Sequence, residues 1–235
     1  MLGLAGCTVY VPTIPSTPLL SKGQLQVSAG LRNLNSVEGG AAWAPTRHLL
    51  LSAESALSSG NGSKGSFHRQ LSLGAGYYHA SAASHTYLAV LGGAGLAGAT
   101  VYDKTLYLSL GLSPSLNEVP YQANYWRYYA QAYLASDLSA KAIVGFSLRT
   151  VYVDYTRLTY GGKPFASDNN VFVEPTFFVR AGNGPLQVQG AAGLSLPTHT
   201  GPDNQPGNST SPISSLVGVA LIFRPDLLKH RQKEN

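Results

Sequence analysis

Charged residues are scarce in this sequence. Only 11% of its 235 residues are Asp, Glu, Lys or Arg, whereas a typical soluble domain contains roughly 25%. A soluble domain covers its outside with polar and charged side chains, and this chain has few charged ones. An outer surface that faces lipid would need none. The shortage of charge therefore argues against a soluble domain and favours one that is embedded in a membrane.

Cysteine, methionine and long apolar runs are also scarce. Cysteine and methionine occur once each, and a single cysteine excludes an internal disulfide. No run of 18 apolar residues occurs, so the sequence predicts no transmembrane helix. The net charge of +5 comes from scattered basic residues, without the aromatic and basic motifs of nucleic-acid modules. We therefore expect no nucleic-acid partner.

The most regular stretch lies between Val171 and Leu196. Apolar and polar residues alternate strictly on both sides of a turn at residues 182–185. Strict alternation indicates half-buried strands, because successive side chains point to opposite faces of a sheet. Each half is about ten residues long, which is the length a tilted strand needs to cross a bilayer. We expect a membrane-spanning hairpin here.

The same alternation recurs from residue 23 to residue 224. It predicts an all-β fold, a transmembrane antiparallel up-and-down barrel of about ten strands, with eight or twelve as alternatives. Residues 103–120 are ambiguous, and are either a loop with an ordered hairpin arm or an extension of the sheet. Connections after the third, fifth, seventh and ninth segments are long, and the others are short, including the one after the first segment, which breaks the alternation. Bacterial outer-membrane barrels show this rhythm of long outer loops and short periplasmic turns.

Aromatic residues near the predicted strand ends suggest the interfacial girdles of a membrane barrel. Tyr and Trp also favour strands in general, which is the alternative explanation. The candidates are Trp43, Tyr77, Tyr87, Tyr102, Tyr125, Trp126, Tyr152 and Tyr155.

The two ends of the chain differ from the barrel region. Residues 1–7 end in Leu4-Ala5-Gly6-Cys7, which resembles the lipobox at the end of a truncated bacterial lipoprotein signal. The resemblance implies that Cys7 carries diacylglycerol. Residues 8–22 hold prolines at spacing three and predict an extended periplasmic tether. Residues 225–235 form a charged periplasmic tail, and we expect both chain termini to be periplasmic.

Residues 23–224 resemble small bacterial outer-membrane barrels, and the lipobox with its proline-rich tether resembles uncharacterised barrel lipoproteins of Bacteroidota type. The last segment resembles the C-terminal assembly signal of this class through Gly218, Leu221 and Phe223. Leu216 stands where that signal prefers a polar residue. The resemblance implies a bacterial outer-membrane location. It also implies that outer-membrane lipids and the barrel-assembly machinery are partners.

Charged residues on the polar faces of the predicted strands should face the lumen. Opposite charges inside a narrow barrel must pair, so we expect an interior salt-bridge network. A selectivity ring or catalytic cluster is the alternative, but an ion-selective ring usually has one sign of charge. We expect Glu54 and Glu174 to pair with the arginines. The members are Glu54, Arg127, Arg149, Glu174 and Arg180.

Catalytic motifs are missing from the sequence. No Gly-x-Ser-x-Gly, metal-spaced histidine pair or phosphate-binding loop occurs, so we expect no enzyme, no metal and no cofactor. We expect a structural role, or an interaction role in which the outer loops bind an unknown ligand. An outer-membrane hydrolase or lipid-modifying enzyme is the alternative, and a narrow solute channel is a third option. The residues weighed for catalysis are His68, His79, His85, His199 and Asp203.

Overall fold

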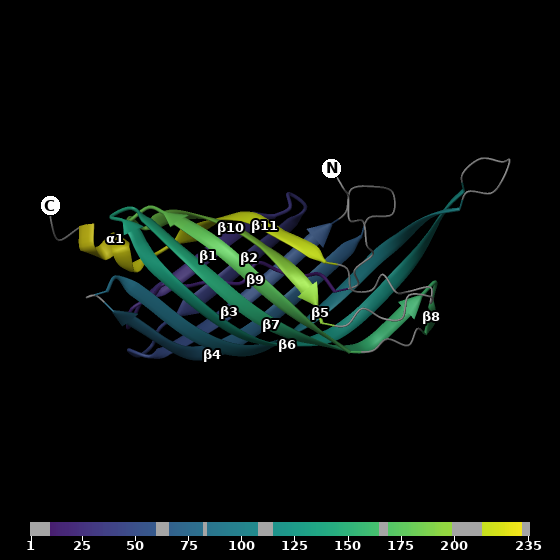
Figure 1. Ribbon diagram of the computed structural model, residues 1–235, viewed down its shortest axis with the longest axis horizontal. Helices are drawn as coiled ribbons and strands as arrows, with labels where there is room; N and C mark the ends of the chain where they lie inside the picture. Colours follow the sequence, from purple (N-terminus) through teal and green to yellow (C-terminus); the bar gives the residue numbers. More distant parts are fainter. Residues whose placement is uncertain are drawn as a thin grey trace.

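Ten antiparallel strands form a closed β-barrel (Figure 1). The structure, a computed structural model, describes residues 10–59, 66–81, 84–107, 115–164, 169–198 and 213–231. Each long strand pairs with the next one along the chain, and pairing of the first with the last closes the ring. The all-β up-and-down barrel of ten strands that the sequence predicts is thereby confirmed. The barrel strands are β1 (Leu25–Arg32), β2 (Ser36–Trp43), β3 (Leu49–Ser59), β4 (Phe67–Ser81), β5 (Thr86–Tyr107), β6 (Ser115–Ser139), β7 (Ala142–Tyr160), β9 (Asn170–Ala181), β10 (Leu186–Pro197) and β11 (Ser214–Phe223).

The ambiguous stretch at residues 103–120 is an extension of the sheet. β5 and β6 remain paired as far as Tyr107 and Ser115, and Figure 1 shows both strands projecting beyond their neighbours. A two-residue strand, β8 (Lys163–Pro164), pairs with the end of β7. These additions lengthen one side of the barrel and leave the ten-stranded ring unchanged.

The two ends of the barrel differ in their connections. At one end, which we call the short-turn end, short connections join β2 to β3, β4 to β5, β6 to β7 and β9 to β10. The longer connections lie at the other end, the long-loop end, together with the short link from β1 to β2 at residues 33–35. β1 begins and β11 ends at the short-turn end, where helix α1 (Asp226–Arg231) follows (Figure 1). Among the described residues, no helix is long and apolar enough to cross a membrane.

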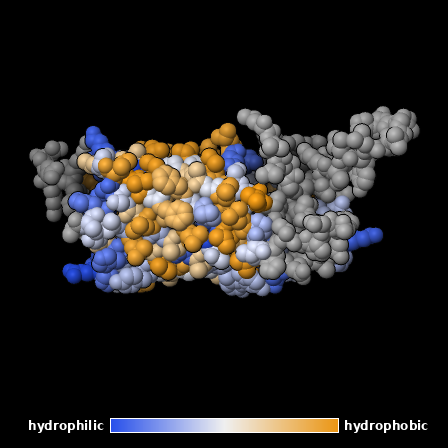
Figure 2. Space-filling model, in the orientation of Figure 1, coloured by the Kyte–Doolittle hydropathy of each residue, from blue (hydrophilic) through white to orange (hydrophobic). Residues whose placement is uncertain are grey.

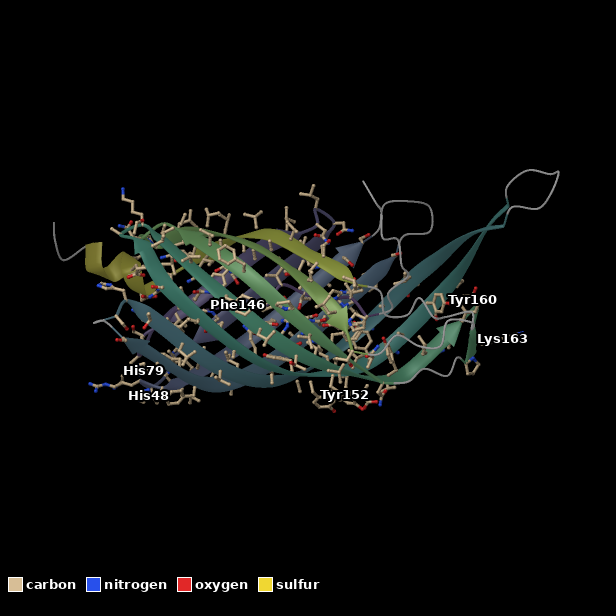
Figure 3. The ribbon with its side chains drawn as sticks, viewed as in Figure 1. His48, His79, Phe146, Tyr152, Tyr160 and Lys163 are labelled. Carbon is tan, nitrogen blue, oxygen red and sulfur yellow. The ribbon has the colours of Figure 1, made fainter. Side chains whose placement is uncertain are left out.

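The barrel wall is apolar outside and polar inside. Leucine, valine and phenylalanine side chains on alternate positions are exposed on the outer face, for example Leu73 at 63% and Phe146 at 50%. Figure 2 shows them as a hydrophobic band, and Figure 3 shows Phe146 on the outer side of β7. On the inner face, Arg127, Arg149 and Glu174 are completely buried. This arrangement is the reverse of a soluble barrel, in which the apolar residues would face inward.

The aromatic residues predicted to form a girdle divide between the two faces of the wall. Trp43, Tyr77, Trp126 and Tyr152 are exposed on the outer face, and Figure 3 shows Tyr152 toward the long-loop end. The prediction is wrong for Tyr87 and Tyr125, which are buried in the lumen. Strand alternation explains this, because neighbouring residues such as Tyr125 and Trp126 must point to opposite faces. Tyr155 packs against buried residues, and the side chain of Tyr102 lies outside the described part.

The proline-rich stretch lies inside the barrel. A periplasmic tether at residues 8–22 would be free of the barrel, but Tyr10 and Leu20 are buried at 0% and 1% exposure among lumenal side chains. The tether prediction is therefore wrong for residues 10–20. The physical reason is the size of the lumen: eight strands enclose a space that wall side chains can fill, and ten enclose a wider one. An extended chain occupies the remaining space.

Candidate functional site

The candidate site is the lumen together with residues 10–22, which we call the lumenal segment. Near the long-loop end, the ring of Tyr10 packs against Phe172, with 4.3 Å between ring centroids. Near the short-turn end, Leu20 belongs to a buried cluster with Tyr78 and Phe178. The segment therefore runs along the barrel, from the long-loop end to the short-turn end.

Wall side chains bind the carbonyl groups of the segment. Gln131 donates to the Ser16 carbonyl at 2.7 Å, and Tyr133 donates to the Pro18 carbonyl at 2.6 Å. Arg180 donates to the Thr17 carbonyl at 2.7 Å. An extended proline-rich chain makes no internal hydrogen bonds, so its buried carbonyls need partners elsewhere. The lumen supplies them from several different strands.

Acidic side chains accept from the amides of the segment. The Ile14 amide donates to Glu38 at 3.1 Å, and the Ser16 amide donates to Glu54 at 3.0 Å. Proline has no amide hydrogen, so the positions of Pro12, Pro15 and Pro18 need no acceptor. The sequence of the segment thus reduces the number of donors that the lumen must satisfy.

Arg149 is the centre of the charge network. Its guanidinium lies 2.7 Å from Glu174 and 3.4 Å from Glu54, and it also donates to the Thr13 carbonyl. Glu174 accepts further hydrogen bonds from Tyr10 and from Ser195. The structure thus brings three of the five predicted network residues together, and the network binds the segment as well as the wall.

Arg127 and Arg180 have different partners. Among the described residues, neither forms a salt bridge with a carboxylate. Arg180 donates to Gln189 and Gln26, at 2.8 and 3.2 Å. Arg127 donates to the hydroxyl of Thr13 at 3.3 Å and lies 5.5 Å from the centre of the Tyr129 ring. These two arginines are bound by neutral groups, and carboxylate pairing is concentrated on Arg149.

A second pair and a small cavity complete the lumen. Arg32 and Glu38 form a salt bridge at 2.8 Å near the long-loop end. A cavity of about 70 Å³ lies between the segment and the wall, beside Gly40 and Gly218. The lumen is therefore densely filled where the segment crosses it.

The residues of the predicted assembly signal divide between the two faces of β11. Leu221 and Phe223 are exposed outside, at 54% and 42%. Gly218 faces the lumen, where an added Cβ would lie 2.4 Å from Ile14 and 2.5 Å from the Leu31 carbonyl oxygen. Leu216, on the same inner face, is fully buried. Gly218 is thus required for close packing, whatever its role in assembly.

A Gly218→Ala change is expected to destabilise the barrel by about 1–3 kcal/mol, because the new methyl group would clash with fixed backbone. Gly190→Ala on β10 is the matched control, since an added Cβ there meets no atom within 4 Å. Urea unfolding in detergent would measure both. Equal stability of the two variants would contradict the packing role of Gly218.

The catalytic candidates are dispersed. His68 is buried, and its ring lies 3.4 Å from the Tyr125 hydroxyl. His79 is exposed near the short-turn end (Figure 3), and His85 contacts Asp137 at 3.1 Å on the surface at that end. Cys7, His199 and Asp203 lie outside the described residues. Within the described part, no three His, Cys, Asp or Glu side chains form a group that could hold a metal ion.

Sequence reasoning missed the residues that bind the segment. Gln131 and Tyr133 on β6, Gln189 on β10 and Tyr10 in the segment itself were not predicted as site residues. The sequence does contain one signal for these residues, which is the number of glutamines at inward positions. A wall with a purely structural role would not need amide side chains there. Amide side chains both donate and accept, which suits them to bind polypeptide backbone.

No family model matches the chain, and neither a curated protein nor a solved structure matches it.

Proposed function

We propose that this chain is an outer-membrane β-barrel lipoprotein of Bacteroidota type with a structural or loop-mediated interaction role. The observation that carries the proposal is the apolar outer wall, on which leucines such as Leu73 and Leu221 are more than half exposed. Lipid would remove this surface from water, which stabilises a protein by about 25 cal/mol per Å². In an aqueous environment the same apolar surface would stay exposed to water.

The orientation follows from the loops, if the barrel resembles others of its class. Bacterial barrels have short turns on the periplasmic side and long loops outside, so the short-turn end and helix α1 would be periplasmic. The partners would be outer-membrane lipids and the barrel-assembly machinery. The machinery would recognise Gly218, Leu221 and Phe223. An unknown ligand would bind the outer loops. A lipid on Cys7 belongs to the same proposal.

The filled lumen favours an interaction role over solute passage. A channel needs a continuous aqueous path, whereas the lumenal segment binds side chains on β2, β3, β6, β7, β9 and β10. Steady conductance of the intact chain in planar bilayers would therefore contradict the proposal. The alternative, an outer-membrane hydrolase, would have to use residues such as His199 and Asp203.

Arginine substitutions on the outer wall test the membrane location. Leu73→Arg, midway along β4, is expected to destabilise the barrel by about 2–4 kcal/mol in lipid vesicles, because an arginine at the bilayer midplane is costly. Leu138→Arg, beside the short turn after β6, is the matched control. Its cost should be about 0–1 kcal/mol, because the position is interfacial.

The two leucines are similarly exposed, at 63% and 70%, so only depth in a bilayer separates them. Urea unfolding in vesicles measures the difference. Equal, small effects of both substitutions would indicate that the outer wall faces water, and the proposed membrane location would then be abandoned.

A further inference from the structure

The direction of the lumenal segment has a consequence for the topology of the chain. Gly23 donates to the Ala44 carbonyl at the short-turn end, just before β1 begins. Thirteen positions earlier, Tyr10 donates to Glu174 and packs against Phe172, near the start of β9 at the long-loop end. The chain therefore passes along the inside of the barrel before its first strand begins.

The length of the segment matches the thickness of a membrane. An extended proline-rich chain rises about 3.1 Å per residue, so residues 10–20 extend roughly 31 Å. The hydrocarbon core of a bilayer is about 30 Å thick. The segment is thus long enough to reach from one membrane face to the other through the lumen.

The lumen has the properties of a binding site for an extended proline-rich polypeptide. Its hydrogen bonds go mainly to backbone groups of the segment, through Gln131, Tyr133, Arg180 and the acidic residues described above. Arg224, just after β11, donates to the Leu19 carbonyl at 3.1 Å and fastens the segment at the short-turn end. The ring closes through β1 and β11 alone, so the segment is bound by the barrel and is not one of its strands.

We propose that the lumen has a further function, which is to carry the N-terminal region of its own chain across the membrane. Tyr10, the first described residue, lies toward the long-loop end, opposite to helix α1, so the chain enters the lumen from that face. The barrel then displays its N-terminal region outside the cell and keeps its C-terminal region in the periplasm. This inference rests on the proposed membrane location, and it differs from the expectation that both termini are periplasmic.

Cysteine accessibility in intact cells tests the display. Cys7 is the sole cysteine, so Cys7→Ser gives a background for single probes, with export directed by a cleavable leader fused before Met1. Three variants carry one new cysteine each: Thr8→Cys before the segment, Lys163→Cys at the long-loop end (Figure 3) and Asn183→Cys in the short turn after β9. A membrane-impermeant maleimide is the reagent, and heat-modifiable migration shows that each barrel is folded.

Thr8→Cys and Lys163→Cys are expected to label in intact cells, while Asn183→Cys should label only after the outer membrane is permeabilised. If Thr8→Cys instead behaves like Asn183→Cys, the N-terminal region is periplasmic and the proposed display is overturned, although the membrane location stands. If Lys163→Cys and Asn183→Cys label equally in intact cells, the proposed membrane orientation itself has failed.

Discussion

A variant that lacks residues 10–22 is expected to turn a silent barrel into a conducting one. The strands remain closed through β1 and β11, so removal of the segment leaves the wall intact and empties its centre. Inward positions then present four arginines, Arg32, Arg127, Arg149 and Arg180, against three glutamates, Glu38, Glu54 and Glu174. The open lumen should therefore conduct with a mild preference for anions. Single-channel recording in planar bilayers is the measurement.

Ser16→Ala is the matched control for the deletion. Ser16 is bound through its amide and its carbonyl, which the substitution keeps, so this variant should stay silent. A synthetic peptide of residues 10–22 should block the deletion variant again, because the wall groups that bind backbone are still present. A deletion variant that migrates as a folded barrel but shows no conductance would contradict the role of the segment as the plug.

Glu174→Ala is expected to cause the largest loss of stability of any single substitution in the network. The carboxylate is fully buried and lies 2.7 Å from Arg149, and it also accepts from Tyr10 and Ser195. Its removal leaves the buried Arg149 with only the longer contact to Glu54, at 3.4 Å, and breaking a buried ion pair costs about 3–5 kcal/mol. Urea unfolding in detergent would show this as a lower midpoint with an unchanged slope.

Two further variants separate charge from hydrogen bonding at this site. Glu174→Gln should cost less than Glu174→Ala, because the amide oxygen still accepts from Tyr10 and Arg149. Glu174→Ala combined with Arg149→Met and Glu54→Gln should recover part of the loss, because Glu54 would otherwise lose its partner and the triple variant leaves no unpaired charge among these three residues. The network would not be the source of stability if Glu174→Ala unfolded at the same urea concentration as the unchanged protein.

The strands could be predicted because each one carries its own signal. Alternation places Glu174 and Arg180 on one face of β9 whatever the rest of the chain does. It could not predict that Arg149 would bind Glu174 and Glu54 while Arg180 would bind Gln189. Pairing depends on the register and stagger between strands, and a face assignment leaves both undetermined.

The lumenal segment is the opposite case, because its local pattern predicts its conformation but not its location. Prolines at spacing three indicate an extended chain, and residues 11–21 form no helix, strand or turn as they run along the lumen. An extended chain with no periodicity has the same appearance in solvent and in a lumen. Its partners, such as Gln131 for Ser16, lie in parts of the sequence where no local pattern indicates the contact.

The distances along the chain between the lumenal segment and its partners determine when it can bind during folding. Tyr10 and Glu174 are separated by 164 residues, and Leu19 and Arg224 by 205. Contacts of such long range form late, because the intervening chain must first be ordered. The segment is made before every strand, and its contacts with Glu38 and Glu54 need only β2 and β3, but its full set of partners is complete only with the last strands. Closure of β1 against β11 therefore has to occur around the segment, and a stretch that is synthesised before the barrel is among the last parts to become fully ordered.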